Sequence, residues 1–96
     1  MNRLWLAGVV KEASPLRHSP AGIPIAEALI EHSGLAELAG GARELTFELT
    51  VQAAGALAAK LSALPPGTRV KLDGALNRKS RNSRQLILIV NRIEKE

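Results

Sequence analysis

The sequence predicts an all-β fold, a small Greek-key barrel of five strands with an optional short helix between strands 3 and 4. Three observations support this class. Five short segments show the apolar alternation or the apolar runs that are typical of strands. Turn-forming Gly and Pro residues separate these segments. Glycines inside the first and fourth strands, Gly8 and Gly74, favour a barrel because they let strands coil tightly.

The first two strands are expected at residues 4–10 and 23–32. In 4–10 both alternating sets of side chains are apolar, as in a strand that is buried on two sides. In 23–32 the apolar face consists of Ala26, Ala28 and Ile30. Residues 13–24 contain three prolines and a glycine, so we expect a turn-rich connection between these strands.

The middle of the chain predicts a loop, a strand and a helix. Residues 33–43 contain three glycines and are expected to form a mobile loop, with one helical turn at 35–38 as an option. Residues 44–51 are the clearest strand, because apolar residues occupy every second position: Leu45, Phe47, Leu49 and Val51. The alanine-rich segment 53–64 predicts a helix that closes one end of the barrel.

The last two strands are expected at residues 68–76 and 85–93. Five strands with a helix after the third are the pattern of the OB-fold, in which the loops 1–2 and 4–5 flank the nucleic-acid face. In this chain those loops fall at about 11–22 and 77–85.

The length of 96 residues allows one domain, residues 1–96, and is too short for two cores. The chain has no cysteine, and His18 and His32 have no second ligand at metal-binding spacing, so no metal site is expected. No nucleotide-binding loop or catalytic triad accompanies the outward pair Glu44 and Glu48. The sequence therefore predicts a protein without catalytic residues and without a cofactor, and not an enzyme.

The sequence predicts a cytoplasmic protein that does not contact membranes. The N-terminal residues lack the apolar core of a signal peptide. No apolar run approaches the length that crosses a bilayer. We therefore expect a soluble, intracellular chain.

The basic charge is concentrated in the segment 77–84, which reads NRKSRNSR. The chain holds 13 Lys and Arg against 9 Asp and Glu, a net charge of +4. This one loop carries four of the cations and no acid, so the rest of the chain is close to neutral. A solvated hairpin tip is the simpler interpretation. The position of the loop at the binding face of an OB-fold favours contact with a polyanion.

Short matching elements occur along nearly the whole chain: Asn2-Arg3-Leu4, Gly8, Val10, Pro15-Leu16-Arg17, Ser19-Pro20-Ala21-Gly22-Ile23-Pro24, Glu31-His32, Arg43, Val51, Val70, Gly74 and Ile93-Glu94. These elements resemble the bacterial primosomal replication protein N (PriB) family. The resemblance implies a homodimeric OB-fold protein that binds single-stranded DNA. It also implies a role in restarting stalled replication forks, with the PriA helicase and other primosome proteins as partners.

The resemblance also implies which residues contact nucleic acid: Arg78, Lys79, Arg81, Arg84, Arg17, His18 and Arg43. One position departs from the family pattern, which has a tryptophan for base stacking where this chain has Thr46. Its neighbour Phe47 is expected in the core. Trp5 is expected to pack, at the dimer interface for example, with base stacking as the alternative. Because Thr46 cannot stack on a base, we expect weaker binding of single strands, and an affinity that depends more on salt.

Two alternatives to a single-stranded DNA-binding protein remain. The first is a protein-interaction module of the primosome with weak or vestigial DNA binding, which Thr46 and the acids Glu44 and Glu48 favour. The second is an RNA-binding OB domain, because contacts to phosphate do not identify the sugar.

Overall fold

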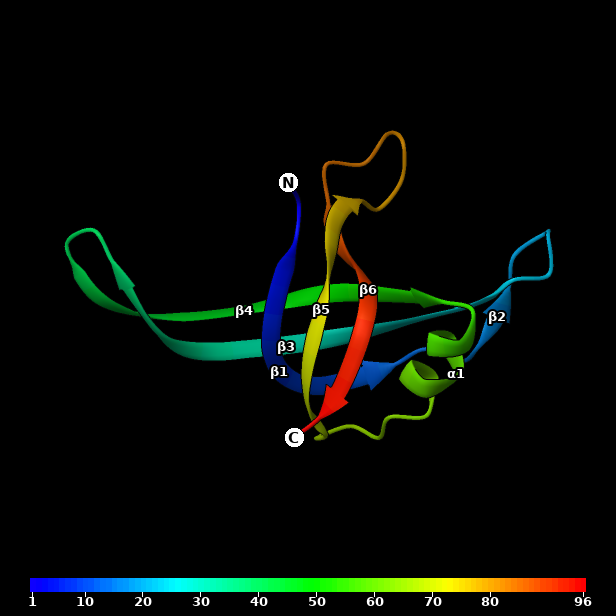
Figure 1. Ribbon diagram of the computed structural model, residues 1–96, viewed down its shortest axis with the longest axis horizontal. Coiled ribbons are helices and arrows are strands. Elements are labelled where there is room, and N and C mark those ends of the chain that lie inside the picture. Colours follow the sequence, from blue (N-terminus) through cyan, green and yellow to red (C-terminus); the bar gives the residue numbers. More distant parts are fainter.

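The computed structural model describes all residues from 1 to 96 and shows six strands and one helix (Figure 1). The elements, in chain order, are β1 (Leu4–Ala13), β2 (Arg17–His18), β3 (Pro24–Leu38), β4 (Gly41–Ala54), α1 (Ala56–Ser62), β5 (Arg69–Arg78) and β6 (Leu86–Lys95).

The strands form a closed sheet in the order β1-β5-β6-β4-β3, and a second pairing of β1 with β3 completes the circle. All of these pairs are antiparallel except β4 and β6, which are parallel where Val51 lies opposite Leu88. The two-residue strand β2 only extends the edge of β3. The structure confirms the predicted five-stranded OB-fold barrel with one short helix before the last two strands.

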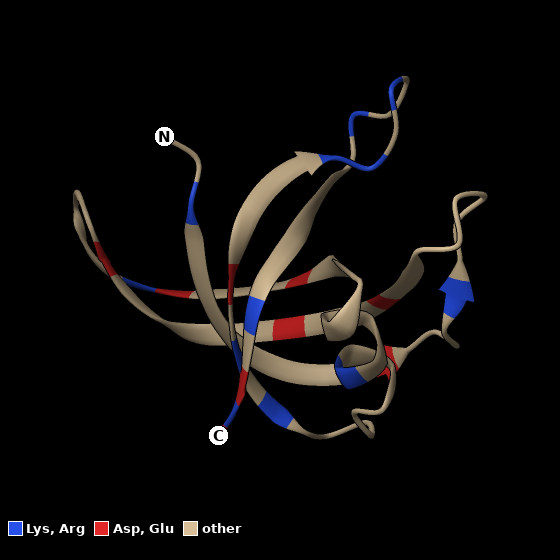
Figure 2. Ribbon diagram, turned by 45° about the vertical axis from the view of Figure 1, so that its right-hand side comes forward, with Lys and Arg blue, Asp and Glu red and all other residues tan.

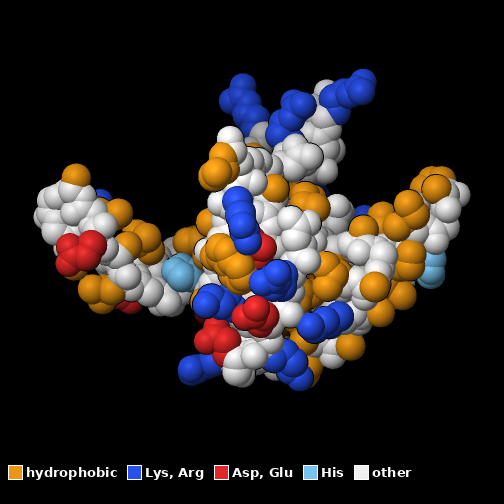
Figure 3. All heavy atoms as spheres, viewed as in Figure 1, with side chains coloured by type: hydrophobic (Ala, Val, Ile, Leu, Met, Phe, Trp, Pro, Cys, Tyr) orange, Lys and Arg blue, Asp and Glu red, His pale blue; other side chains and the backbone are white.

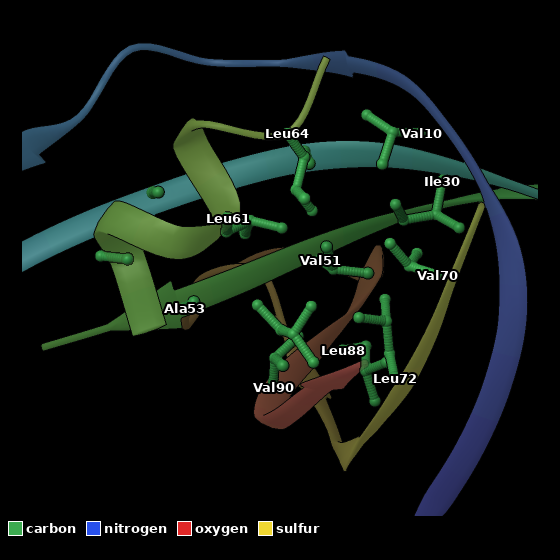
Figure 4. Close-up of a cluster of buried hydrophobic side chains, with 14 residues drawn as sticks. Val10, Ile30, Val51, Ala53, Leu61, Leu64, Val70, Leu72, Leu88 and Val90 are labelled. Atoms are coloured by element: carbon green, nitrogen blue, oxygen red, sulfur yellow. The ribbon is translucent and has the colours of Figure 1, made fainter. Parts of the chain in front are cut away.

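The core fills the inside of this barrel with aliphatic side chains from every long strand and from α1 (Figure 4). Inward positions alternate along the strands, so that Val70 and Leu72 of β5 are both fully buried. The helix contributes Ala58 and Leu61, which are also fully buried. It therefore covers an end of the barrel as expected. No helix of the structure is long and apolar enough to span a membrane.

The helix is shorter than predicted because β4 continues to Ala54. Gly55 then ends the strand with a φ of 68°, a backbone conformation that glycine adopts readily. Only after this reversal do residues with helical periodicity begin.

The two strand glycines allow backbones to approach closely. A Cβ atom built on Gly74 would lie 2.0 Å from the carbonyl oxygen of Ile89 on β6. One built on Gly8 would lie 2.6 Å from the carbonyl oxygen of Glu31 on β3. These two positions are where β1 and β5 coil against their neighbours, which agrees with the function predicted for the glycines.

The prediction of a mobile loop at residues 33–43 is wrong, as is the optional helical turn within it. The β3–β4 ladder continues without a break from Ile25 opposite Ala54 to Leu38 opposite Gly41. Only Ala39 and Gly40 form the turn, where Gly40 has a φ of 102°. Gly34 takes an ordinary strand conformation opposite Leu45. The glycines were misleading because only those at the turn reverse the chain.

The resulting hairpin extends beyond the barrel as an arm, hereafter the β3–β4 arm, in a molecule of 48 × 30 × 20 Å (Figure 1). Along one face of β4, burial decreases outward from Val51, which is 0% exposed, to Phe47, which is 41% exposed. The prediction that Phe47 belongs to the core is therefore wrong. The alternation was correct, but at Phe47 the arm has already left the barrel.

Candidate nucleic-acid interface

The loop between β5 and β6, residues 79–85, closes the β5–β6 hairpin and stands above one end of the barrel (Figure 1). The backbone N–H of Lys79 donates to the carbonyl of Gln85 at 2.9 Å. A tighter turn forms inside the loop, where the N–H of Ser83 donates to the carbonyl of Ser80 at 3.1 Å. The amide of Gln85 also donates to the hydroxyl of Ser83 at 3.0 Å. Local hydrogen bonds thus hold this loop in a projecting conformation.

Four cations at this loop are predicted to bind DNA, and all of them are exposed: Arg78, Lys79, Arg81 and Arg84. We call these four residues the basic loop. None of them takes part in the three ion pairs of the structure, which join Arg3 to Asp73, Lys11 to Glu31 and Arg17 to Glu27. The one side-chain contact within the group runs from Nη1 of Arg78 to the carbonyl of Arg81 at 2.8 Å. Figures 2 and 3 show these charges at the tip of the loop without acids around them.

Arg17 and His18 form β2, a second projection on the barrel, and both are exposed. Arg17 is not free, because its Nη2 lies 3.5 Å from Oε2 of Glu27 on β3. Gln52 donates to the same oxygen at 3.1 Å. The net charge that this projection offers to a phosphate is therefore smaller than the sequence indicates.

Arg43 lies near the start of β4, opposite Ala36 and close to the turn of the β3–β4 arm. This arm and β2 are at opposite ends of the long axis of the molecule, with the basic loop between and above them (Figure 1). The seven predicted residues therefore occupy three separate projections and do not line one pocket.

Position 46 contributes no ring to the surface. Thr46 is exposed on the arm, and its Oγ1 lies 3.4 Å from Oγ of Ser33. The neighbouring Phe47 stacks on His32 of β3, with ring centroids 5.2 Å apart and planes 34° apart. The ring N–H of His32 donates to the carbonyl of Ala7 at 2.6 Å, which fixes the pair against β1. Phe47, the exposed aromatic residue of the arm, thus lies one position after the one at which the family pattern has a tryptophan.

Sequence reasoning did not detect a cluster around Trp5 on the outer face of β1, β5 and β6. Three cations from three strands lie over its ring: Arg3, Lys71 and Arg92. Arg3 also pairs with Asp73, the one charged residue that is buried. The hydrogen bond to Asp73, and then the charge of that carboxylate, raises the pKa of Arg3 above its ordinary value. No sequence signal brings residues 3, 71 and 92 together, because strand register alone does so.

A closed five-stranded barrel with a short helix before its last two strands defines a class, the OB-fold proteins, whose loops bind oligonucleotides or oligosaccharides. The family model described as "Another single-strand binding protein family" matches residues 2–92. Over 89 residues the chain is 32% identical to the replication restart protein PriB of Nitrosomonas europaea, covering 93% of this chain and 82% of the relative. It is 37% identical over 76 residues to PriB of Bordetella pertussis, and this match covers 79% of this chain and 71% of the relative.

The solved structure of PriB from Ralstonia solanacearum superposes with a TM-score of 0.89 at 33% identity. It covers 100% of this chain and 99% of that one. The chain belongs to the PriB family of replication restart proteins, within the single-strand-binding group of OB folds. This membership confirms the resemblance drawn from the sequence, and with it the prediction that the chain is not an enzyme.

Proposed function

We propose that this protein binds single-stranded DNA through the basic loop during replication restart. The observation that carries the proposal is the exposure of the four cations Arg78, Lys79, Arg81 and Arg84, with no ion pair to any acid. Cations without an ion pair inside the protein need not give up a carboxylate partner before they bind phosphate. Each phosphate that they neutralise releases counterions from the strand, which drives association.

The remaining predicted contacts are secondary in this account. Arg17 shares its charge with Glu27, and Arg43 lies on a distant arm that also carries Glu44 and Glu48. Because Thr46 supplies no ring, the stacking that contributes about 1–3 kcal/mol per base is absent from that position. Binding is therefore mainly electrostatic and weakens steeply as salt rises.

We further propose that the protein acts in the cytoplasm with the PriA helicase and other primosome proteins. The support is its family, since the relatives are replication restart proteins. In this role it holds the single strand beside the helicase and stimulates or recruits it. Stimulation of PriA unwinding by the added protein tests this part. An unchanged unwinding rate at saturating protein would contradict it.

We also propose a homodimer, formed through β1. Residues Leu4 to Val9 of β1 pair with β5, but β3 pairs with β1 only from Val9 onward. Residues 4–8 therefore have no partner strand along their other edge, where only the carbonyl of Ala7 accepts, from the ring of His32. An edge without a partner strand is a template for pairing with another strand. A second copy of β1 satisfies this edge. Light scattering is expected to give twice the chain mass of 10.2 kDa, and a monomer mass would contradict the dimer.

The DNA-binding proposal is tested by titrating a labelled oligo-dT at two salt concentrations with two variants. In the first variant, Arg78, Lys79, Arg81 and Arg84 are all changed to Gln. In the matched control the same change is made at Lys11, Lys60, Arg69 and Lys95, which lie outside the proposed sites. Either variant has 13 − 4 = 9 cations against 9 acids, so both have zero net charge.

The expected result is a large loss of affinity in the loop variant only. Its plot of log affinity against log salt should flatten by up to about 2.8, since each contact to a single strand contributes roughly 0.7. Equal losses in the two variants would mean that net charge, and not the loop, attracts the strand.

A second candidate function is a protein-interaction module with weak or vestigial DNA binding. The observation that favours it is the acidic β3–β4 arm, which carries Glu37, Glu44 and Glu48 and has no ring at position 46. In this case the wild-type protein stimulates PriA while the oligonucleotide shows no binding even at low salt. The same titration therefore separates the two functions.

A further inference from the structure

We propose that Trp5 is a base-stacking platform in a second DNA contact site, on the outer face of β1, β5 and β6. Lys71 and Arg92 bind the phosphates beside the stacked base. The inference rests on the proposed binding of single-stranded DNA but concerns a different surface, which belongs neither to the basic loop nor to the strand that carries Thr46.

Trp5 is placed on this face by the alternation of β1, in which Leu6 and Val10 point inward and are buried. Trp5 is 40% exposed and is therefore accessible to a ligand from solvent. It lies opposite Asp73 in the β1–β5 register, and Asp73 lies opposite Arg92 in the β5–β6 register. The three strands therefore bring Trp5 and its neighbours to one spot.

Three cationic groups lie over the ring. The guanidinium carbon of Arg3 and the ammonium of Lys71 are each 5.7 Å from the ring centroid, and the guanidinium carbon of Arg92 is 5.8 Å from it. Such cation–π contacts contribute about 0.5–1 kcal/mol at exposed sites. They also hold the cations next to the aromatic surface.

The charges of this cluster are only partly neutralised. Arg3 is paired with Asp73, at 3.0 Å between Nε and Oδ1. Lys71 and Arg92 take part in none of the ion pairs of the structure. Glu94 lies opposite Lys71 in the β5–β6 register, yet the ammonium of Lys71 is found over Trp5. Two cations beside an exposed indole thus remain available to an anion.

Single-stranded DNA is the ligand that fits this combination. Non-specific single-strand sites combine an aromatic face for bases with cations that follow the backbone. A base that stacks on Trp5 displaces a cation from the ring, and that cation then lies within reach of the adjacent phosphate. The pairing of a ring with phosphate-binding cations is the chemistry that position 46 no longer supplies.

The cluster also continues the basic loop. Lys71 and Arg92 are on β5 and β6, the two strands that the loop joins. Arg78 follows Asp73 by five residues on β5, a rise of about 17 Å. Figure 3 shows Lys and Arg side chains over these strands below the cations of the loop. One strand of DNA can therefore contact the loop and then run along this face.

The experiment uses the fact that Trp5 is the single tryptophan of the chain. Oligo-dT is added to the wild-type protein at low salt while the intrinsic fluorescence is recorded, and a labelled oligo-dT is followed by anisotropy in parallel. Stacking predicts that the tryptophan fluorescence is quenched, with the same midpoint as the anisotropy change. This readout requires no substitution and therefore does not depend on the folding of a variant.

Substitutions then test the contacts. Trp5→Leu is expected to weaken binding of the labelled strand roughly 5- to 150-fold, the range for loss of one stacked base. Lys71→Gln with Arg92→Gln should weaken it roughly 2- to 30-fold, as two exposed charge contacts do. The charge-matched control, Lys11→Gln with Lys95→Gln, should bind like the wild type. Circular dichroism and light scattering check that each variant keeps its fold and its mass.

Binding by anisotropy with unchanged Trp5 fluorescence and unaltered affinity of Trp5→Leu would overturn this inference and leave the proposed function intact. The reverse result, quenching at Trp5 with no effect of the basic-loop substitutions, would overturn the function of the loop and keep the Trp5 site. Two other outcomes also overturn the inference. In one, an acidic peptide quenches Trp5 while oligo-dT does not; in the other, Trp5→Leu changes the mass of the particle but not the affinity.

Discussion

The barrel and the parts that project from it differ in how their residues are used. In the barrel, apolar side chains from five strands and α1 are packed together, and Gly8 and Gly74 allow the backbones to touch. The basic loop, β2 and the β3–β4 arm are held by local hydrogen bonds and by ladder pairing, with side chains exposed. The comparison teaches that the residues that stabilise this protein and the residues proposed to bind DNA are separate. The barrel supplies the fold, and the groups that we propose as DNA contacts are exposed on its projections and outer face.

The largest effect is expected from removing a core side chain. Leu72→Ala deletes a fully buried side chain of β5 and should lower the free energy of unfolding by about 2–5 kcal/mol. The same change on the arm, Leu35→Ala, removes a side chain that is 78% exposed and should cost less than about 0.5 kcal/mol. Urea unfolding at one protein concentration measures the free energy of unfolding of both variants. Similar losses at the two positions would contradict the separation.

A second comparison adds one methyl group to a glycine in each region. Gly74→Ala places a Cβ 2.0 Å from a backbone oxygen that cannot move aside, and we expect a loss of about 1–3 kcal/mol or more. Gly34→Ala on the arm meets only the ring of His32, at 3.4 Å, and should be tolerated. Thermal melting followed by circular dichroism compares the two variants. A tolerated Gly74→Ala would show that β5 and β6 are not in close contact there.

A smaller effect is expected where the arm leaves the barrel. Phe47→Ala removes the ring that stacks on His32 and should lower the free energy of unfolding by about 0.5–1.5 kcal/mol. Urea unfolding provides this value as well. A loss as large as that of Leu72→Ala would place Phe47 among the core residues after all, for example through burial by a second copy of the chain.

The smallest change in stability is expected for the basic loop. The variant with Gln at positions 78, 79, 81 and 84 should keep the wild-type free energy of unfolding within about 0.5 kcal/mol, because these side chains are exposed and make no ion pair. Its affinity for DNA should nevertheless decrease. A clearly destabilised loop variant would mean that the loop also contributes to the fold.

The sequence predicts the barrel better than the parts that project from it, for a physical reason. Burial imposes alternation on Ala26, Ala28 and Ile30 and on Val70 and Leu72, and this pattern is readable in a single chain. Residues 33–43 of the β3–β4 arm were missed because they lie outside the barrel and show no such pattern. The ladder of the arm depends on a partner strand and on the turn at Gly40.

The position of the basic loop was predictable because its cations are contiguous in the sequence, and their function in binding stays a prediction. The cluster at Trp5 was not predictable, since Arg3, Lys71 and Arg92 are brought together by the register of three strands. The burial of Asp73 on the outer face of β5 was likewise not predictable from the sequence. Its burial is understood only with its partner Arg3, which is 70 residues away in sequence.

The central claim, that the basic loop is the DNA contact of this barrel, is tested most directly by amide chemical shifts. A ¹⁵N-labelled sample of this 10.2 kDa chain is titrated with oligo-dT, and the shift of each backbone amide is recorded. We predict that the largest changes occur at Arg78 to Arg84, while the amides of α1 and of the β3–β4 turn stay in place. Shifts that are confined to the arm, with the loop unaffected, would contradict the claim.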